Sequence, residues 1–252
     1  MQSQQYQNHI GNVLYKVNVY QYAVKFYHHS DHYKNSDEQA LKCLYNMGLD
    51  YNEKGEYRKA RTAFKEAGDY KDSDSKKVEA LKEAIRISKP GTSVIKIGKY
   101  TWKVLEVEDN KALLLKNKVL PEMTFCSSVE NASWEDSDLR KFLNNDFIDK
   151  AVFSPEEMKN ILKTPVSNGG NSVYGVAGGN DTSDYLFLLS NEEARSYESV
   201  FKKFKGRTWL RSPGGAPGSA SFLTDKGLVM DYGYAVTSDE FTAMPAMWFN
   251  LQ

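Results

Sequence analysis

The sequence predicts an α+β protein in which an all-helical region, residues 1–89, precedes a mixed α+β domain, residues 94–252. Three observations predict this class. An internal repeat runs through the first region, the pattern changes at Lys89-Pro90-Gly91-Thr92-Ser93, and short extended runs with capped helical segments follow. Proline cannot continue a helix, so this stretch is the predicted boundary.

The helical region repeats itself at an offset of 37 residues. A period of this size is typical of stacked helix pairs. Gly48 and Ala60 are small enough for paired helices to approach closely, and Tyr51 and Phe64 are expected to fill the space on either side. The segment Lys76 to Ile87 supplies a further helix, as a cap or a spacer. The matched pairs are Gly11/Gly48, Tyr20/Tyr57, Ala23/Ala60, Tyr27/Phe64, Tyr33/Tyr70, Lys34/Lys71, Ser36/Ser73, Asp37/Asp74, Leu41/Val78 and Leu44/Leu81.

The second domain opens with three predicted strands. Val94 to Ile97 and Thr101 to Val107 are extended runs around Gly98. Ala112 to Leu115 follows a turn at Glu108-Asp109-Asn110. This order predicts an opening β-meander.

Helical segments in this domain are predicted from their caps. Asp136 or Ser137 can cap the first helix. Ser154-Pro155-Glu156-Glu157 and Ser190 with Glu193 each fit a capping box, in which the N-cap hydroxyl and the third-residue carboxylate accept backbone N–H groups. The expected apolar stripes are Leu139, Phe142, Leu143 and Phe147 on the first helix, and Met158, Ile161 and Leu162 on the second.

A Gly/Asn/Ser-rich stretch, Asn168 to Asp184, predicts a long exposed loop. Its glycine pairs, Gly169-Gly170 and Gly178-Gly179, lack the lysine and following helix of a phosphate-binding loop, so a flexible loop is the favoured interpretation. Tyr185 to Leu189 then predicts a buried strand.

The composition excludes several classes of function. The chain has 33 basic and 33 acidic residues, so no net field predicts a nucleic-acid partner. Cys43 and Cys126 are far apart, which predicts no disulfide framework and no zinc site, and no metal or cofactor is expected. No apolar run is long enough to span a membrane, and no signal peptide is visible. A cytoplasmic location is the default expectation, with surface display or virion association left open.

Two short clusters could be taken for metal sites. His28 and His32 lie one helical turn apart near Asp31, but no third ligand is evident, and a solvated helix end is favoured. Asp69-Tyr70-Lys71-Asp72-Ser73-Asp74 begins like a calcium loop but lacks the glycine and glutamate that such a loop needs. A junction between two helices is the better account.

Two tryptophan-containing segments, 209–214 and 245–250, flank a stretch rich in Gly, Ser, Asp, Thr and Tyr. Tyrosine offers large contact area at low entropy cost, and small polar residues offer adaptable hydrogen bonding. Residues 215–243 are therefore predicted to bind a protein or cell-surface ligand, although half of their aromatic residues could instead pack the domain. Arg140 and Arg211 are predicted to serve the scaffold. The candidate ligand-binding residues are Phe222, Asp231, Tyr232, Tyr234, Thr237, Asp239, Glu240 and Phe241, and the predicted scaffold anchors are Trp209, Arg211, Pro245 and Trp248.

Ordered motifs over residues 94–252 carry a family resemblance: Trp134-x2-Ser137-x-Leu139-Arg140-x2-Leu143-Asn144-x2-Phe147, Phe153-Ser154-x-Glu156-Glu157, Thr182-x-Asp184-x2-Phe187-Leu188-Leu189-Ser190-x-Glu192-Glu193-Ala194, Trp209-Leu210-Arg211-Ser212-Pro213-Gly214 and Pro245-Ala246-Met247-Trp248. Together they resemble bacterial and phage domains of the C-type-lectin-like, formylglycine-generating-enzyme-like class. In the helical region, the residues Gly48-x2-Tyr51, Tyr57-x2-Ala60, Phe64 and Ala67 resemble the tetratricopeptide pattern.

The resemblance implies a fold in which the two terminal strands of the domain pair and the late loops form one exposed face. Some relatives are variable proteins of diversity-generating retroelements, and here the diversified segment would be residues 209–248. Met244 stands where those relatives usually carry arginine. The oxidase branch of the class needs paired late cysteines, which this chain lacks.

The favoured hypothesis is a non-enzymatic ligand-binding protein, the variable target of such a retroelement. The alternative is an intracellular adaptor in which the helical half recognises a peptide and the C-terminal domain is structural. A protein partner or self-association is expected through the helical repeats 1–88. A formylglycine-generating-type oxidase is the least favoured.

Overall fold

The computed structural model describes residues 2–130, 132–202 and 206–252, and it shows an α+β protein with a helical N-terminal part. The chain divides into two compact units, Met1–Ile87 and Ser88–Gln252. Met1, where the predicted helical region begins, lies outside the described residues.

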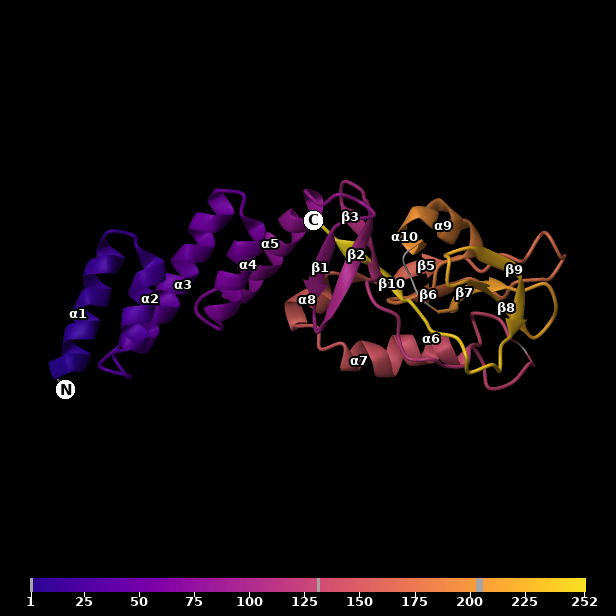
Figure 1. Cartoon of the computed structure of the whole chain (residues 1–252), viewed down its shortest axis with the longest axis horizontal. Coiled ribbons are helices and arrows are strands. Elements are labelled where there is room, and N and C mark those ends of the chain that lie inside the picture. Colours follow the sequence, from indigo (N-terminus) through magenta and orange to yellow (C-terminus); the bar gives the residue numbers. More distant parts are fainter. Residues whose placement is uncertain (1, 131, 203–205) are drawn as a thin grey trace. The chain divides into compact units, whose positions relative to one another are not determined.

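The first unit is a succession of helices in which each packs against the next (Figure 1). The prediction of stacked helices from the repeat is confirmed. The bounds are α1 Gln2–Lys16, α2 Tyr20–His28, α3 Ser36–Glu53, α4 Tyr57–Glu66 and α5 Ser73–Arg86.

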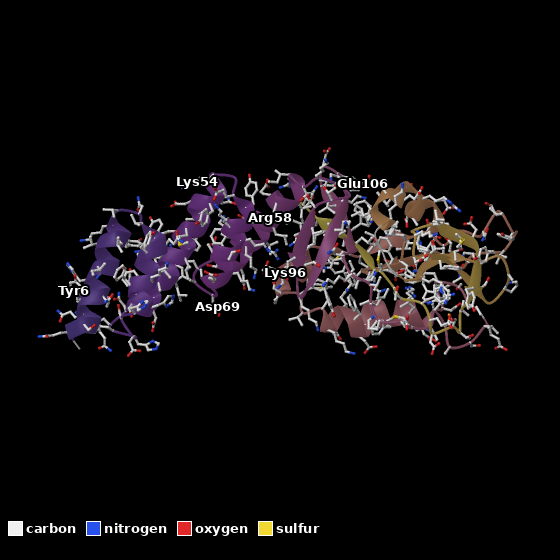
Figure 2. All side chains as sticks on the ribbon, in the orientation of Figure 1. Tyr6, Lys54, Arg58, Asp69, Lys96 and Glu106 are labelled. Carbon is white, nitrogen blue, oxygen red and sulfur yellow. The ribbon has the colours of Figure 1, made fainter. Side chains whose placement is uncertain are left out.

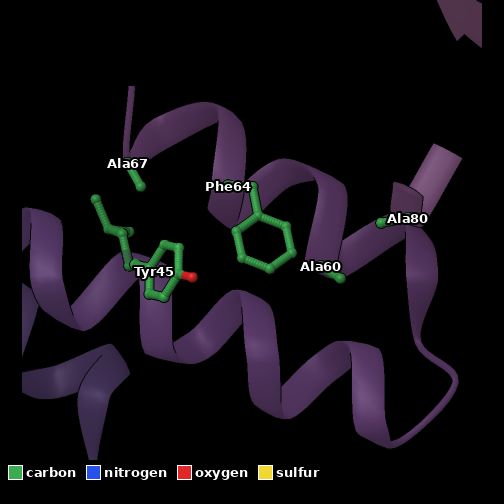
Figure 3. Close-up of a cluster of buried hydrophobic side chains, with 6 residues drawn as sticks. Tyr45, Ala60, Phe64, Ala67 and Ala80 are labelled. Carbon is green, nitrogen blue, oxygen red and sulfur yellow. The ribbon is translucent and has the colours of Figure 1, made fainter. Parts of the chain in front are cut away.

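Close packing in this unit depends on two glycines that occupy the same place in the repeat. A Cβ atom added to Gly48 would lie 2.5 Å from Cε1 of Phe64, and one added to Gly11 would lie 2.8 Å from Cδ1 of Tyr27. Each aromatic ring therefore rests directly on the backbone of the preceding helix. Figure 3 shows the buried cluster around Phe64, where the Tyr45 ring meets Phe64 edge-on with 5.7 Å between centroids.

The turns that enter α3 and α5 also repeat. Lys34 and Lys71 both have left-handed backbone angles, with φ of 53° and 52°. Ser36 and Ser73, which begin the two helices, are both fully buried. Asp72 accepts a hydrogen bond of 2.6 Å from the Tyr45 hydroxyl. The segment that begins like a calcium loop is thus a junction between helices, as predicted.

The larger sheet of the second unit has the order β1-β2-β3-β10-β4, and its pairs are antiparallel. The predicted opening meander is confirmed. The expectation that the two terminal strands of the domain pair is wrong, because β10 pairs with β3 and β4 while β1 pairs with β2. The bounds are β1 Val94–Ile97, β2 Tyr100–Val107, β3 Lys111–Lys116, β4 Ile161–Leu162 and β10 Ala246–Asn250.

The short helices of this unit begin at the predicted caps. The Ser137 hydroxyl accepts from the backbone N–H of Arg140, and both capping boxes, at Ser154 and at Ser190, are complete. The predicted stripe of the second helix is wrong beyond Met158, because the helix ends at Lys159 and the next two apolar residues form β4 against β10. The bounds are α6 Asp138–Phe142, the π-helix η1 Leu143–Phe147, α7 Ile148–Lys150, α8 Pro155–Lys159, α9 Asn191–Ser196 and α10 Glu198–Phe201.

Two smaller sheets complete the unit, a pair β5-β6 and a three-stranded sheet with order β7-β8-β9. The predicted strand over Tyr185 to Leu189 is not one, although Leu186 to Leu189 are buried and Phe187 bridges to Ala246. The predicted exposed loop, 168–184, is also partly wrong, since it ends in β6 and buries Asn168 and Asn171. The bounds are β5 Thr164–Val166, β6 Thr182–Asp184, β7 Thr208–Pro213, β8 Ser219–Leu223 and β9 Val229–Ala235.

Candidate functional site

A buried aromatic cluster forms the floor of the site. Trp209 on β7 pairs with Phe222 on β8, and Phe241 stacks on Trp209 with ring centroids 4.0 Å apart and planes at 22°. Phe222 and Phe241 meet edge-on at 5.0 Å. Both phenylalanines are buried, at 4% and 0% exposure, so the prediction that they contact a ligand is wrong. Their rings carry no polar atom that would favour contact with water, and they pack against each other and against Trp209.

Two tyrosines lie above this floor and remain exposed. Tyr232 and Tyr234 on β9 are 55% and 42% exposed. The Tyr232 ring meets Phe222 edge-on at 5.8 Å, and the Tyr234 ring lies 5.2 Å from Phe241. Each tyrosine thus has one side held by a buried ring and the other open to solvent. We call Tyr232, Tyr234 and the exposed residues of the following loop, Thr237, Asp239 and Glu240, the tyrosine surface.

One arginine ties this surface to its floor. The Arg207 guanidinium carbon lies 4.5 Å from the centre of the Phe241 ring and 5.4 Å from that of Tyr234. The same guanidinium pairs with Glu240, whose side chain is 61% exposed. A cation held over aromatic rings is attracted by their negative faces. The arrangement places a positive and a negative charge beside Tyr234.

Asp231, another predicted contact residue, is held by two side chains of the domain. Its carboxylate accepts a hydrogen bond of 2.6 Å from the side-chain amide of Asn191 and pairs with Arg195. Both partners belong to α9, so the carboxylate fastens β9 to that helix. Asp231 thus has a structural role, and its side chain is still 22% exposed, so its contact with a ligand stays a prediction.

Trp209 and Arg211 hold the start of the segment by buried polar contacts. The Trp209 indole N–H donates to the Met123 carbonyl at 2.9 Å. The Arg211 guanidinium donates to the carbonyls of Ser167 at 3.1 Å and Leu188 at 2.9 Å, and to both carboxylate oxygens of Glu193. Glu193 is also the capping-box residue of α9. These contacts within the domain are consistent with the predicted scaffold role of Arg211.

Pro245 and Trp248 hold the end of the segment through the larger sheet. Pro245 is buried, and its carbonyl accepts a hydrogen bond of 2.9 Å from the Lys116 backbone N–H. Trp248 lies opposite Leu113 in the β3–β10 pair, and the Lys111 ammonium nitrogen is 4.1 Å from its ring centre. The segment therefore ends in a strand with partners on both sides.

Arg140 also has the predicted scaffold role. Its Nε donates to a carboxylate oxygen of Asp184 at 2.8 Å, and the Trp134 indole N–H donates to the other oxygen at 3.0 Å. Asp184 is 1% exposed, and the cost of burying its carboxylate is compensated by the Arg140 guanidinium and the Trp134 N–H. These contacts hold α6 against the end of β6.

One exposed aromatic residue next to the tyrosine surface was missed by the sequence analysis. Tyr174 is 49% exposed. A Cβ added to Gly215 would lie 3.1 Å from Tyr174 Cδ1 and 3.2 Å from the Tyr232 Cα, so Tyr174 and β9 flank the same glycine. The signal for it was an apolar Val173-Tyr174 pair inside a polar, glycine-rich stretch.

A cleft of about 570 Å³ opens in the same unit, between the segments 125–136, 168–180 and 211–220. The glycine pair Gly178-Gly179 forms part of its wall. A Cβ on Gly178 would lie 1.8 Å from the Asn168 carbonyl oxygen, and one on Gly179 would lie 2.8 Å from Ser133. These glycines therefore permit close backbone packing, and the flexibility of this loop stays a prediction.

Few of the described residues are candidates for metal binding or catalysis. These residues contain no group of three or more His, Cys, Asp or Glu that could hold a metal ion, and no helix long and apolar enough to cross a bilayer. His32 Nδ1 lies 2.5 Å from Asp37, whose hydrogen bond raises the pKa of the imidazole. Cys43 and Cys126 are buried thiols, and burial raises the pKa of each.

Comparisons with known proteins give one family. Searches of curated proteins and of solved structures found no match. A family model described as "Domain of unknown function (DUF6273)" matches residues 109–250, which include the aromatic floor, the tyrosine surface and the cleft. Because this match covers more than half of the chain, the protein belongs to the DUF6273 family.

Proposed function

We propose that the second unit is a non-enzymatic binding module that recognises a protein or cell-surface ligand through the tyrosine surface. One observation carries this proposal: two exposed tyrosines on one strand rest on a buried aromatic floor. A large exposed ring would ordinarily lose conformational entropy on binding. Here the Phe222 and Phe241 contacts already restrict both rings, so less entropy remains to be lost.

The chemistry of the surface indicates the kind of ligand. Tyr232 and Tyr234 offer apolar faces with hydroxyl groups, and Arg207, Asp239 and Glu240 supply charges of both signs nearby. Aromatic residues with arginine are typical of the central contacts of protein interfaces. A protein surface with an apolar pocket and mixed charge fits this surface better than a nucleic acid, which would need a basic one.

Diversification of the segment is a further part of the proposal, and it rests on the resemblance to retroelement variable proteins and to the C-type-lectin-like class. Burial alternates with exposure along residues 231–241, since Gly233, Val236 and Phe241 are buried while Tyr232, Tyr234, Thr237, Asp239 and Glu240 are exposed. Exposed positions on a fixed scaffold tolerate substitution with little effect on stability. Sequencing the neighbouring DNA tests this part: a reverse transcriptase gene beside a near-copy of codons 209–248 supports it, and its absence contradicts it.

Binding itself is tested with a matched pair of variants. Tyr232 and Tyr22 are both 55% exposed, but Tyr22 lies on α2 in the other unit. The immobilised chain is exposed to detergent-solubilised surface proteins of host cells, and retained proteins are compared by quantitative mass spectrometry for wild type, Tyr232→Ala and Tyr22→Ala.

We expect a specific partner whose retention falls about tenfold or more for Tyr232→Ala, as for a residue at the centre of an interface. Retention by Tyr22→Ala should match wild type, and the thermal unfolding of both variants should be nearly unchanged. The proposal fails if no retained protein distinguishes the two variants. It also fails if Tyr232→Ala unfolds the domain, since that residue would then belong to the core.

A further inference from the structure

A stripe of apolar side chains runs along α1. Tyr6, Ile10, Val13 and Val17 follow the spacing i, i+4, i+7 and i+11, which places them on one face, with Val17 just beyond the helix end. Tyr6, Val13 and Val17 are 63%, 49% and 61% exposed, and Ile10 is partly buried. Figure 2 labels Tyr6 on the side of α1 away from α2. We call these four residues the α1 stripe.

The internal repeat shows what this row of residues does in the other helices. One repeat after Tyr6 lies Cys43 on α3, which is fully buried in a cluster with Ala23 and Tyr27 of α2. Two repeats after Tyr6 lies Ala80 on α5, which is fully buried in a cluster with Phe64 of α4. At this position both helices pack against a preceding helix. On α1 the same row faces solvent.

The repeat alone does not explain the whole stripe. The positions one repeat after Val13 and Val17 are Asp50 and Lys54, so the row is polar at that end of α3. On α1 the corresponding end is apolar and largely exposed. Contiguous exposed apolar surface of this kind marks an interaction site. The α1 stripe is thus longer than the corresponding apolar row on α3, which ends before Asp50.

We propose that the α1 stripe binds the α1 stripe of a second copy of the chain, with the two helices antiparallel about a twofold axis. An axis midway between Ile10 and Val13 places Ile10 opposite Val13 of the other copy, and Tyr6 opposite Val17. Every residue of the stripe then meets another member of it, as an isologous interface requires.

The charge of α1 favours a second copy as the occupant. A twofold interface brings like residues of two copies close together, so a charged helix would repel itself. The chain is 26% charged, yet α1 has no acidic residue and its one lysine is Lys16, in the last turn. An antiparallel pair keeps the two Lys16 side chains at opposite ends. This inference concerns the helical unit and does not depend on the proposed function of the other one.

The first test compares two single substitutions that add the same charge to α1. Sedimentation velocity of the full chain is measured over a concentration series up to about 100 μM, where even a dimer with a dissociation constant of about 10 μM is well populated. We expect a wild-type dimer, and we expect Tyr6→Glu to raise its dissociation constant at least tenfold, because the new carboxylate is buried opposite Val17. Gln5→Glu, at the adjacent exposed position outside the stripe, should leave the constant within about twofold.

The second test establishes the orientation. Native Cys43 and Cys126 are buried, so an introduced surface cysteine dominates oxidation. Chains with Ile10→Cys and chains with Val13→Cys, carrying tags of different size, should form a disulfide more efficiently when mixed than either does alone. A monomeric wild-type chain would overturn the proposal, as would a dimer that Tyr6→Glu and Gln5→Glu weaken equally. Efficient cross-linking of Ile10→Cys to itself would indicate a parallel pair and would overturn the antiparallel arrangement.

Discussion

Replacement of Gly48 by alanine sets two known effects against each other. Alanine in place of glycine inside a helix normally stabilises by about 1 kcal/mol, because the unfolded chain loses conformational freedom. At Gly48, however, the added Cβ would lie 2.5, 2.6 and 2.7 Å from three ring carbons of Phe64. Non-bonded carbon atoms prefer about 3.5–4.0 Å, so either the ring or the helix must move.

The ring has little room to move. Phe64 is 1% exposed, and Tyr45 meets it edge-on at 5.7 Å. Overfilling a packed core costs about 1–3 kcal/mol, and overlap with three ring atoms places this case near the upper end. After subtracting the gain in helix propensity, we expect Gly48→Ala to lower the free energy of unfolding by about 1–2 kcal/mol.

Urea unfolding of the full chain, followed by far-UV circular dichroism, measures this change. The repeat supplies an internal comparison, since Gly11→Ala meets Tyr27 at 2.8 Å and should cost less. Adding Phe64→Leu to Gly48→Ala should recover about 1 kcal/mol relative to the sum of the single effects, because the smaller side chain admits the methyl group. A Gly48→Ala variant more stable than wild type would refute the close contact between α3 and α4.

Two further predictions concern the second unit. Arg211→Lys should lower the free energy of unfolding by about 2–3 kcal/mol, because lysine cannot satisfy Glu193 and two buried carbonyls together. Arg195→Lys, at an ion pair whose arginine is 49% exposed, should cost under about 1 kcal/mol in the same urea titration. Equal losses would contradict the scaffold role. Lys116 is buried, and desolvation lowers its pKa from 10.5 to about 8, so folding disfavours its charged form. Lys116→Met should therefore stabilise the protein by about 1–3 kcal/mol at neutral pH. This gain should shrink between about pH 8 and 10.5, because in that range Lys116 is protonated in the unfolded chain but neutral in the folded one. Urea titrations of wild type and Lys116→Met across this range measure the gain, and a gain that stays constant would contradict the prediction.

Local signals allowed much of the fold to be predicted from the sequence. The cap residues Ser137, Ser154 and Ser190 act through hydrogen bonds to backbone groups three residues away, so a short stretch of sequence contains the whole interaction. The repeat was equally readable, because Gly48 and Phe64 recur as Gly11 and Tyr27. Tertiary contacts decided the elements that were missed. Ile161 and Leu162 continue a helical pattern but pair with β10 instead, which lies some ninety residues later in the chain.

The candidate site could be located from the sequence but not divided into surface and core. Phe222, Tyr232, Tyr234 and Phe241 follow neither helical nor strict strand spacing. The pairing of β8 with β9 is irregular between Ala220 and Phe222, and Gly233 has a left-handed φ of 70°. Tyr232 and Tyr234 are two residues apart on β9, so their side chains lie on the same face of the strand and both are exposed. No pattern in the sequence marks which face of this strand is open to solvent.

The position of β10 has a consequence for how the second unit folds during synthesis. Residues 246–250 complete the larger sheet from its middle, joining β3 on one side to β4 on the other. The meander of β1, β2 and β3 has neighbours close in sequence and can form while the chain is still being made. Until residues 246–250 leave the ribosome, β3 keeps an open edge and β4 has no strand to pair with. The edge of β3 therefore stays open to association with other chains for most of the domain's synthesis, until β10 covers it.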